Sequence, residues 1–136
     1  MDSRIEDKIK DIERFLDEIA PVIPGSFEKY MGDYKIKAVC ERYFEKIVEA
    51  TVDLAFLIRK GEGFKIPEED GEMFLILAEN NIISVELAKR LKDAKGMRNI
   101  IAHEYGDEID DKKVFNAINE ELEKDIREFL NSIKQS

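Results

Sequence analysis

The sequence predicts an all-α fold, an antiparallel bundle of about five helices. Apolar residues recur at intervals of three and four along five segments, and this spacing places them on one face of a helix. No segment shows the alternation of apolar and polar residues that marks a half-buried strand. With 136 residues, 43% of them hydrophobic, the chain is long enough for one core. We therefore expect residues 1–136 to form a single domain.

The first two predicted helices each carry one apolar stripe. Proline and glycine in the segment 21–25 end the first helix, whose stripe consists of Ile5, Ile9, Ile12, Leu16 and Ile19. The second helix spans about residues 35–60 and stops at the GEG stretch of residues 61–63; its stripe consists of Val39, Tyr43, Ile47, Ala50, Leu54 and Leu57. These stripes are the expected core faces of the two helices.

The third and fourth predicted helices have recognisable starts. Pro67 suits the first turn of a third helix that contains the apolar stretch EMFLILAEN. Ser84 can cap a fourth helix, because its hydroxyl can accept a hydrogen bond from a backbone N–H of the first turn. We expect this fourth helix to run from Val85 to about Tyr105, just before Gly106.

The fifth predicted helix begins at Asp110 or Asp111, either of which can cap it. Its apolar stripe consists of Val114, Ile118, Leu122, Ile126, Phe129 and Ile133. The chain contains no internal repeat and no low-complexity segment, so nothing indicates a second domain.

Composition and charge exclude several classes of function. The net charge of −9 argues against a general nucleic-acid coat protein, since phosphate binding needs a local excess of cations. No apolar run approaches the roughly 18 residues of a membrane span, and the N-terminus lacks the apolar core of a secretory signal. We therefore expect a cytoplasmic protein that does not enter the membrane. Cys40 has no intrachain disulfide partner, and one Cys with one His cannot form a zinc site. Acidic side chains can still hold Mg²⁺ or Ca²⁺, but we expect no metal and no cofactor.

The cations are unevenly distributed along the chain. Residues 89–98 (KRLKDAKGMR) hold five Lys and Arg residues against one Asp, a local net charge of +4 in a chain of net charge −9. This basic segment comes directly before the only histidine, His103, in the stretch MRNIIAHEYGD. The neighbourhood of His103 is therefore the strongest candidate for a functional site.

On a helical wheel, the fourth helix places several polar groups beside its core face. With Arg98 set at 0° and about 100° per residue, the apolar positions fall between about 300° and 20°, so Arg98 lies within the apolar stripe. The neighbouring polar strip, at about 60°, 100°, 120° and 140°, consists of Lys95, Asn99, Lys92 and His103. We expect this strip to be accessible to a ligand.

Two further features of the predicted fourth helix concern its surroundings. Because a guanidinium cannot be neutralised, an Arg98 on the core stripe needs a carboxylate partner or a cavity. Glu49 and Asp53 are candidate partners, since they lie one turn apart on the second helix and flank its stripe. Gly96 lies seven residues before His103 and leaves that surface open to close approach by a ligand or a backbone.

Each of these residues also has a simpler structural interpretation. A lone histidine on a helix is more often a surface or capping residue than a catalyst. The lysines can form an ordinary solvated face, Arg98 can be a structural ion-pair partner, and Tyr105 can be a core residue with its hydroxyl at the edge. Glu49 and Asp53 can form an exposed acidic edge. Only the combination of these groups at one helix end favours a functional site.

The motif around His103 resembles that of a known family. The stretch RNIIAHEY matches the R-x-x-x-x-H-x-Y signature of HEPN-domain proteins of the HepT type, with Arg98, Asn99, His103 and Tyr105 at the defining positions. The segments KAVCERYFEKIVEATVDLAFLI and DEIDDKKVFNAINEELEKDIREFL follow the same helical plan, so the resemblance covers nearly the whole chain. That family provides the toxin of prokaryotic HepT–MntA toxin–antitoxin systems. The resemblance implies a helical bundle that forms a homodimer, with the two motifs facing a shared cleft.

The resemblance also implies a metal-independent endoribonuclease, with transfer RNA as the suggested substrate class. In such a reaction the 2′-hydroxyl of RNA attacks the adjacent phosphorus and leaves a 2′,3′-cyclic phosphate. His103 would act as general base or acid, and Arg98 would stabilise charge on the phosphoryl oxygens. Asn99 would orient the imidazole or bind phosphate. Lys92 and Lys95 would guide the RNA electrostatically, a role that the wheel suggests and the family motif does not specify.

By the same resemblance, a nucleotidyltransferase antitoxin of the MntA type attaches AMP to Tyr105. The added negative charge would repel RNA, and the nucleotide would occupy the cleft. An alternative is a non-catalytic module that binds a nucleotide or a nucleotidyltransferase, in which Arg98 and His103 would hold a nucleotide phosphate. A third possibility is a dimeric scaffold with a buried Arg–carboxylate pair. The intact Arg, His and Tyr set favours the nuclease, whereas the overall acidity favours the modules.

Overall fold

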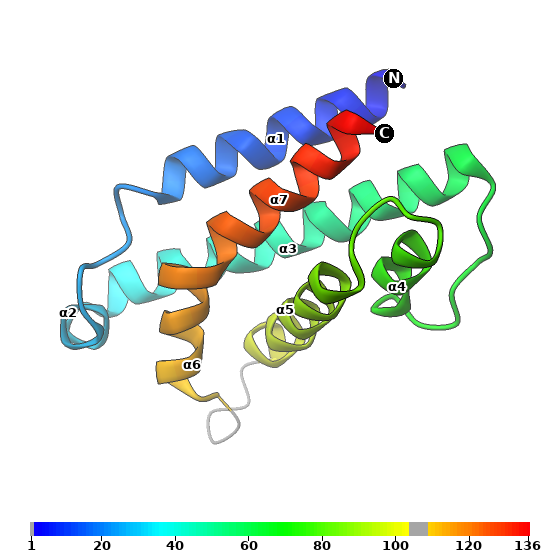
Figure 1. Ribbon diagram of the computed structural model, residues 1–136. Coiled ribbons are helices and arrows are strands. Elements are labelled where there is room, and N and C mark those ends of the chain that lie inside the picture. Colours follow the sequence, from blue (N-terminus) through cyan, green and yellow to red (C-terminus); the bar gives the residue numbers. More distant parts are fainter. Residues whose placement is uncertain (1, 104–108) are drawn as a thin grey trace.

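The computed structural model describes residues 2–103 and 109–136, and this part of the chain contains helices and no strands (Figure 1). The elements are α1 (Ser3–Ile19), α2 (Phe27–Gly32), α3 (Tyr34–Glu62), α4 (Glu72–Glu79), α5 (Val85–His103), α6 (Asp111–Asn116), the π-helical turn η1 (Ala117–Glu121) and α7 (Leu122–Gln135). The predicted all-α class is therefore confirmed. None of the described helices is long and apolar enough to cross a membrane.

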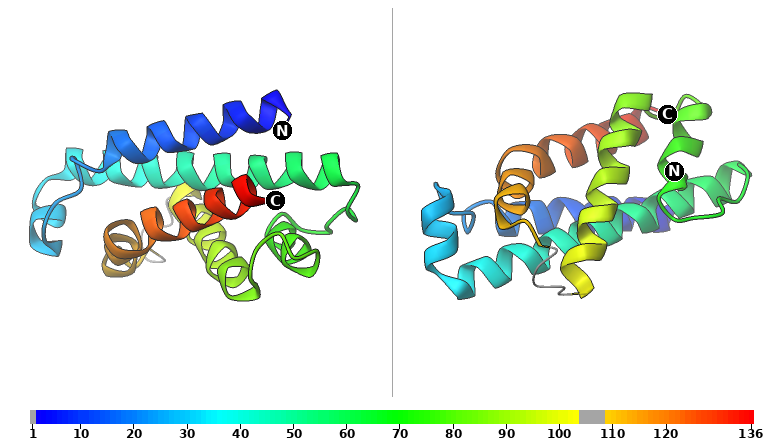
Figure 2. Two further views of the ribbon diagram at one scale, coloured as in Figure 1. Left: turned by 45° about the horizontal axis from the view of Figure 1, so that its top comes forward. Right: turned by 90° about the horizontal axis from the view of Figure 1, so that it is seen from below.

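Helix α3 is the longest element, with 29 residues, and the other helices are arranged around it. Helix α1 runs antiparallel along α3, while α7 lies beside α1 and runs in the same direction as α3 (Figures 1 and 2). Helices α4 and α5 pack against α3 and against each other. In the right-hand view of Figure 2, α5 crosses α3, and its C-terminal end projects beyond α3. The crossing places the end of α5 at the edge of the bundle.

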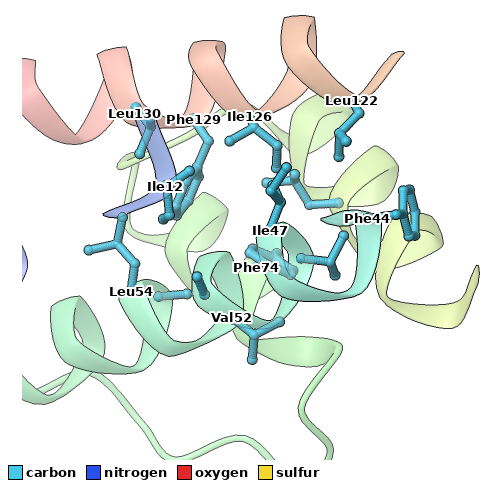
Figure 3. Packing of buried hydrophobic residues seen from close by; sticks show 14 of the residues in the cluster. Ile12, Phe44, Ile47, Val52, Leu54, Phe74, Leu122, Ile126, Phe129 and Leu130 are labelled. Carbon is cyan, nitrogen blue, oxygen red and sulfur yellow. The ribbon is translucent and has the colours of Figure 1, made fainter. Parts of the chain in front are cut away.

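The core lies where α1, α3, α4 and α7 meet (Figure 3). The residues at its centre are at most 1% exposed: Ile12 of α1, Ile47 and Leu54 of α3, Phe74 of α4 and Phe129 of α7. The rings of Phe74 and Phe129 meet edge to face with their centroids 5.9 Å apart. Such a ring pair contributes about 0.5–1.5 kcal/mol beyond the burial of its area. Helix α5 packs against three of the helices that form this core, α3, α4 and α7.

The predicted fifth helix is one helical stretch that contains a π turn. It begins at Asp111, and Asp110 Oδ1 accepts a hydrogen bond from the Lys113 backbone N–H at 3.2 Å. Its buried apolar residues follow at intervals of four, four, four, three and four: Val114, Ile118, Leu122, Ile126, Phe129 and Ile133. On an ideal α-helix each interval of four rotates the buried face by about 40°. The wider π turn, η1, compensates for the three successive intervals of four and keeps these residues on the core.

The structure differs from the predicted elements in the start of the third helix and in one additional short helix. The third helix begins at Glu72 and not at Pro67, because the apolar residues that pack against the core begin only at Met73. The short helix α2 was not predicted. Ser26 caps it, with its Oγ accepting from the Lys29 N–H at 3.2 Å. With six residues α2 is too short to show a helical period, so only the capping serine could have indicated it.

The core face of α3 also differs from the prediction at its N-terminal end. Val39, assigned to the apolar stripe, is 41% exposed. Cys40 and Phe44 are buried in its place, at 0% and 1% exposure. The buried face at this end of α3 is therefore shifted by one residue from the predicted stripe.

Candidate active site

Helix α5 carries the candidate residues at its C-terminal end. The apolar stripe expected from the sequence is confirmed, because Leu87, Leu91 and Ile101, at about 340°, 20° and 300° of the wheel, are buried. Ala88, at about 80°, is also buried, so the buried face is wider near the start of the helix. Arg98 lies on the same face, but its side chain is 26% exposed, so it lies at the edge of the core and not within it.

Arg98 keeps part of its hydrogen-bonding capacity unused. Its side chain is 26% exposed, and Nη2 lies 3.3 Å from Glu49 Oε2 on α3, a side chain that is 54% exposed. Nη1 donates to Asn99 Oδ1 at 3.3 Å. Nε is buried and has no hydrogen-bond partner in the described part of the chain. The exposed part of this guanidinium side chain is suited to binding an anionic ligand.

Of the two carboxylates expected near Arg98, only Glu49 is its partner in the structure. Asp53 Oδ2 instead lies 3.9 Å from Lys8 Nζ of α1. The expected pairing of Asp53, one turn later on α3, with Arg98 is therefore wrong. Because Glu49 is more than half exposed, its pair with Arg98 is a surface ion pair, and such pairs contribute about 0–1 kcal/mol. A buried structural pair is therefore not the explanation for Arg98.

Asn99 joins two cations of the motif region. Its Oδ1 accepts hydrogen bonds from Lys95 Nζ at 3.2 Å and from Arg98 Nη1 at 3.3 Å. An amide oxygen carries no net charge, so it holds the two cations near each other without neutralising them. This arrangement favours an anion such as a phosphate beside Asn99.

His103 is the last residue of α5 and is exposed. On the wheel it lies about 40° from Asn99 and about 140° from Arg98. The imidazole therefore shares the solvent-facing strip of Asn99, whereas a single straight helix does not bring it together with Arg98. Tyr105 lies outside the described residues, so its expected role stays a prediction.

The structure divides the basic segment 89–98 between two environments. Arg90 donates from Nε to Asp125 Oδ1 at 3.0 Å and from Nη2 to Glu128 Oε2 at 2.9 Å, so its charge is satisfied by α7. Lys92 lies instead on a groove that it shares with Lys113 of α6. Lys113 was not predicted as a site residue, because only the fold brings α6 next to α5.

The chemistry available at this site is proton transfer and anion binding. Cys40 is not a competing nucleophile: burial, together with the nearby Glu41 carboxylate, raises the pKa of its thiol to about 11. Within residues 2–103 and 109–136, no three His, Cys, Asp or Glu side chains gather into a candidate metal site. The groups at the end of α5 are an imidazole, a guanidinium, an amide and ammonium groups, which together can move a proton and bind phosphoryl oxygens.

Comparisons with known proteins identify the family. The family model described as "Ribonuclease HepT-like" matches residues 5–133. The chain is 30% identical to the mRNA nuclease HepT of Shewanella oneidensis over 134 residues, which cover 98% of both chains. It is also 30% identical to the tRNA nuclease HepT of Aphanizomenon flos-aquae over 118 residues, or 84% of this chain and 77% of the relative.

A solved structure gives the same result. The fold is similar to that of the tri-AMPylated Shewanella oneidensis HEPN toxin in complex with the MNT antitoxin, with a TM-score of 0.90, 29% identity and 100% of each chain covered. The resemblance that the motif around His103 indicated is thus confirmed over the length of the chain. Together, the family model, the two nucleases and this structure show that the chain belongs to the family of HepT-like ribonucleases.

Proposed function

We propose that this protein is an endoribonuclease toxin that cuts RNA at the C-terminal end of α5. The observation that carries the proposal is the partly open Arg98 guanidinium, which Asn99 links to Lys95, on the same helix end as the exposed His103. Membership of a ribonuclease family supports it. The two related nucleases act on different RNAs at the same identity, so a preference for transfer RNA stays a prediction.

In the proposed reaction, the nucleophile is supplied by the RNA. His103 takes the proton of a 2′-hydroxyl, and the 2′-oxygen attacks the adjacent phosphorus. The bond from phosphorus to the 5′-oxygen breaks, which leaves a 2′,3′-cyclic phosphate. The 5′-oxygen takes up a proton, from the protonated His103 or from His103 of a second subunit, and leaves as a hydroxyl. No step in this sequence needs a metal ion.

Arg98 and its neighbours would stabilise the charge that develops on the phosphoryl oxygens. The N–H groups in the exposed part of the Arg98 side chain fit these oxygens, and Glu49 holds the guanidinium in orientation. Lys95, linked through Asn99, adds a second positive charge. These groups act without moving protons, so their contribution is electrostatic.

A homodimer would bring together groups that a single helix separates. Arg98 and His103 lie about 140° apart on α5. If two copies of α5 face one cleft, Arg98 of one copy can act with His103 of the other. The complete site would then contain residues from both subunits.

The experiment that tests the reaction is incubation of the purified protein with total RNA in excess EDTA, followed by analysis of the new ends. We expect cleavage that leaves 2′,3′-cyclic phosphate and 5′-hydroxyl ends, and no cleavage where a 2′-deoxynucleotide replaces the attacking ribose. Cleavage that needs added Mg²⁺ and still occurs at the 2′-deoxynucleotide would contradict the mechanism. Binding of nucleotides without any cleavage would support the non-catalytic alternative.

We also propose that a nucleotidyltransferase antitoxin silences the toxin by attaching AMP to Tyr105. The support is the tri-AMPylated Shewanella oneidensis toxin in complex with its MNT antitoxin, which shares 29% identity with this chain. With an antitoxin of this type, ATP and Mg²⁺, intact-mass spectrometry should show one or more AMP additions, placed on Tyr105 by fragmentation, with a parallel loss of RNA cleavage. Tyr105→Phe should resist modification. Equal inhibition of wild type and Tyr105→Phe with no mass change would indicate simple occlusion instead.

A further inference from the structure

A groove of about 420 Å³ lies between α5 and the start of α6, beside the proposed active site. This volume falls within the roughly 300–1,000 Å³ that is typical of ligand-binding pockets. Its lining combines apolar and charged residues: Met97, Ile100, Ile109 and Val114 lie beside two lysines, Lys92 and Lys113, and two aspartates, Asp93 and Asp110. Its composition suits a flat apolar group attached to an anion.

The groove and His103 lie on the same side of α5. Gly96, which also lines the groove, precedes His103 by seven residues. On a helix this spacing separates two positions by only about 20° around the axis and by about 10.5 Å along it. Ile100 lies about one turn before His103 on the same side. A ligand in the groove therefore lies about one to two helical turns from a substrate group that reacts at His103.

Gly96 keeps the groove open. A Cβ placed at Gly96 would meet no atom of the described residues within 4 Å, so packing within this part of the chain does not require a glycine. Glycine inside a helix is less favourable than alanine by about 1 kcal/mol. The sequence thus keeps an unfavourable residue where a side chain would project into the groove.

The charged groups at the groove are available to a ligand. None of the ion pairs in residues 2–103 and 109–136 includes Lys92 or Lys113. Two carboxylates also line the groove, and one of them, Asp110, caps α6. The other, Asp93, forms no ion pair within the same residues. The two lysines can therefore bind phosphates, and Asp93 can accept hydrogen bonds from a ligand.

We propose that this groove binds one nucleobase of the RNA, next to the phosphate that is cleaved. The proposal rests on the proposed function and adds a specificity site to it. The aliphatic side chains that line the groove cover the faces of the base and remove its apolar surface from water. Lys92 and Lys113 bind the flanking phosphates. Asp93 accepts from an exocyclic amino group, which favours adenine, cytosine or guanine over uracil.

The experiment fills the groove without disturbing the core. Gly96→Leu replaces an exposed helical glycine by a good helix former whose side chain enters the groove. Gly61→Leu is the matched control, since Gly61 also lies in a helix, has open space at its Cβ and lines a different cavity. Both variants should unfold at or above the wild-type denaturant midpoint. Binding is measured by fluorescence anisotropy with short single-stranded RNAs that carry 2′-O-methyl groups and so cannot be cut, and with a series that lacks one base at a time.

The expected result is a loss of base recognition in Gly96→Leu alone. Wild type and Gly61→Leu should bind the abasic RNA about tenfold more weakly at one position of the series. Gly96→Leu should bind the intact RNA about tenfold more weakly. Removing the base at that position should not weaken its binding further. The proposal would be overturned if Gly96→Leu bound the intact RNA and each abasic RNA as wild type does. It would also be overturned if that variant lost self-association, which would identify a second copy of the chain as the occupant of the groove. If wild type cuts RNA while the profiles are equal, only the groove is refuted; if it neither binds nor cuts RNA, the proposed function fails as well.

Discussion

Arg90 and Arg98 lie eight residues apart on the same helix, but their surroundings differ. Arg90 donates to two carboxylates of α7 at 3.0 and 2.9 Å, and one of these, Asp125, has a side chain that is only 12% exposed. Arg98 has one exposed carboxylate, Glu49, and one amide oxygen as partners, each at 3.3 Å, and its buried Nε has no partner among the described residues. Arg90 therefore helps to hold the bundle together, whereas Arg98 is available to bind an anionic ligand.

This difference shows that the residue type alone does not indicate the role of a cation. Arg90 belongs to the same basic segment as Arg98 and contributes equally to its sequence charge. In the fold, the charge of Arg90 is matched by α7, whereas Asn99 links Lys95 to Arg98 and Lys92 lines the groove. Mutation of Arg90 should accordingly lower stability, whereas mutation of Arg98 should lower activity.

The largest effect is expected for Arg98→Ala. Removing a donor that stabilises transition-state charge typically lowers the rate about 10²–10³-fold. Its surface pair with Glu49 leaves no buried carboxylate behind, so the free energy of unfolding should fall by less than about 1 kcal/mol. The measurement is the RNA cleavage rate together with urea unfolding of the same preparation.

A mixing experiment sharpens the Arg98 result. If each site combines Arg98 of one subunit with His103 of the other, mixing Arg98→Ala with His103→Ala protein should restore part of the activity, because each mixed dimer contains one intact site. Activity that stays absent after subunit exchange would show that both residues act within one chain.

For Arg90→Ala we expect a smaller effect, which lowers the stability of the fold and not the cleavage rate. Losing its charge-assisted hydrogen bonds leaves the mostly buried Asp125 without its partner, which should lower the free energy of unfolding by about 1.5–3 kcal/mol. At a temperature where the variant is folded, its cleavage rate should stay within a few-fold of wild type. A rate loss as large as that of Arg98→Ala, without a loss of stability, would reverse the assignment of the two arginines.

The smallest effect is expected for Lys92→Ala, with Lys89→Ala as its control. Both lysines are exposed on α5, but only Lys92 lines the groove. Lys92→Ala should weaken RNA binding several-fold at low salt and should reduce the slope of log affinity against log salt by about 1. Titrations at several salt concentrations measure this slope. Equal slopes for the two variants would mean that RNA does not pass along the groove.

The sequence predicts most of the helical frame because the frame depends on local signals. The stripe from Ile9 to Ile19 is buried as expected, and Ser84 Oγ accepts from the Leu87 N–H at 3.0 Å as the cap of α5. The strip that contains Lys92, Asn99 and His103 follows from helical spacing alone. These features need no knowledge of the neighbouring helices.

The parts that could not be predicted depend on how helices cross. The wheel places Arg98 on the apolar stripe of α5 but does not show that its side chain reaches the edge of the core. It also does not choose between Glu49 and Asp53, because that choice depends on how α5 passes α3. Lys113 is close to Lys92 only because α6 returns to α5. A sequence pattern on one helix contains no information about such contacts.

The most direct test of the central claim is the initial rate of RNA cleavage in EDTA by His103→Ala, measured on protein whose unfolding curve matches wild type. His103 is exposed at the end of α5, so its loss should change the free energy of unfolding by no more than about 0.5 kcal/mol. Because His103 is the proposed proton-transfer group, its replacement by alanine should lower the rate about 10²–10⁴-fold. Equal rates for wild type and His103→Ala would contradict the account, because the end of α5 would then contain no proton-transfer catalyst.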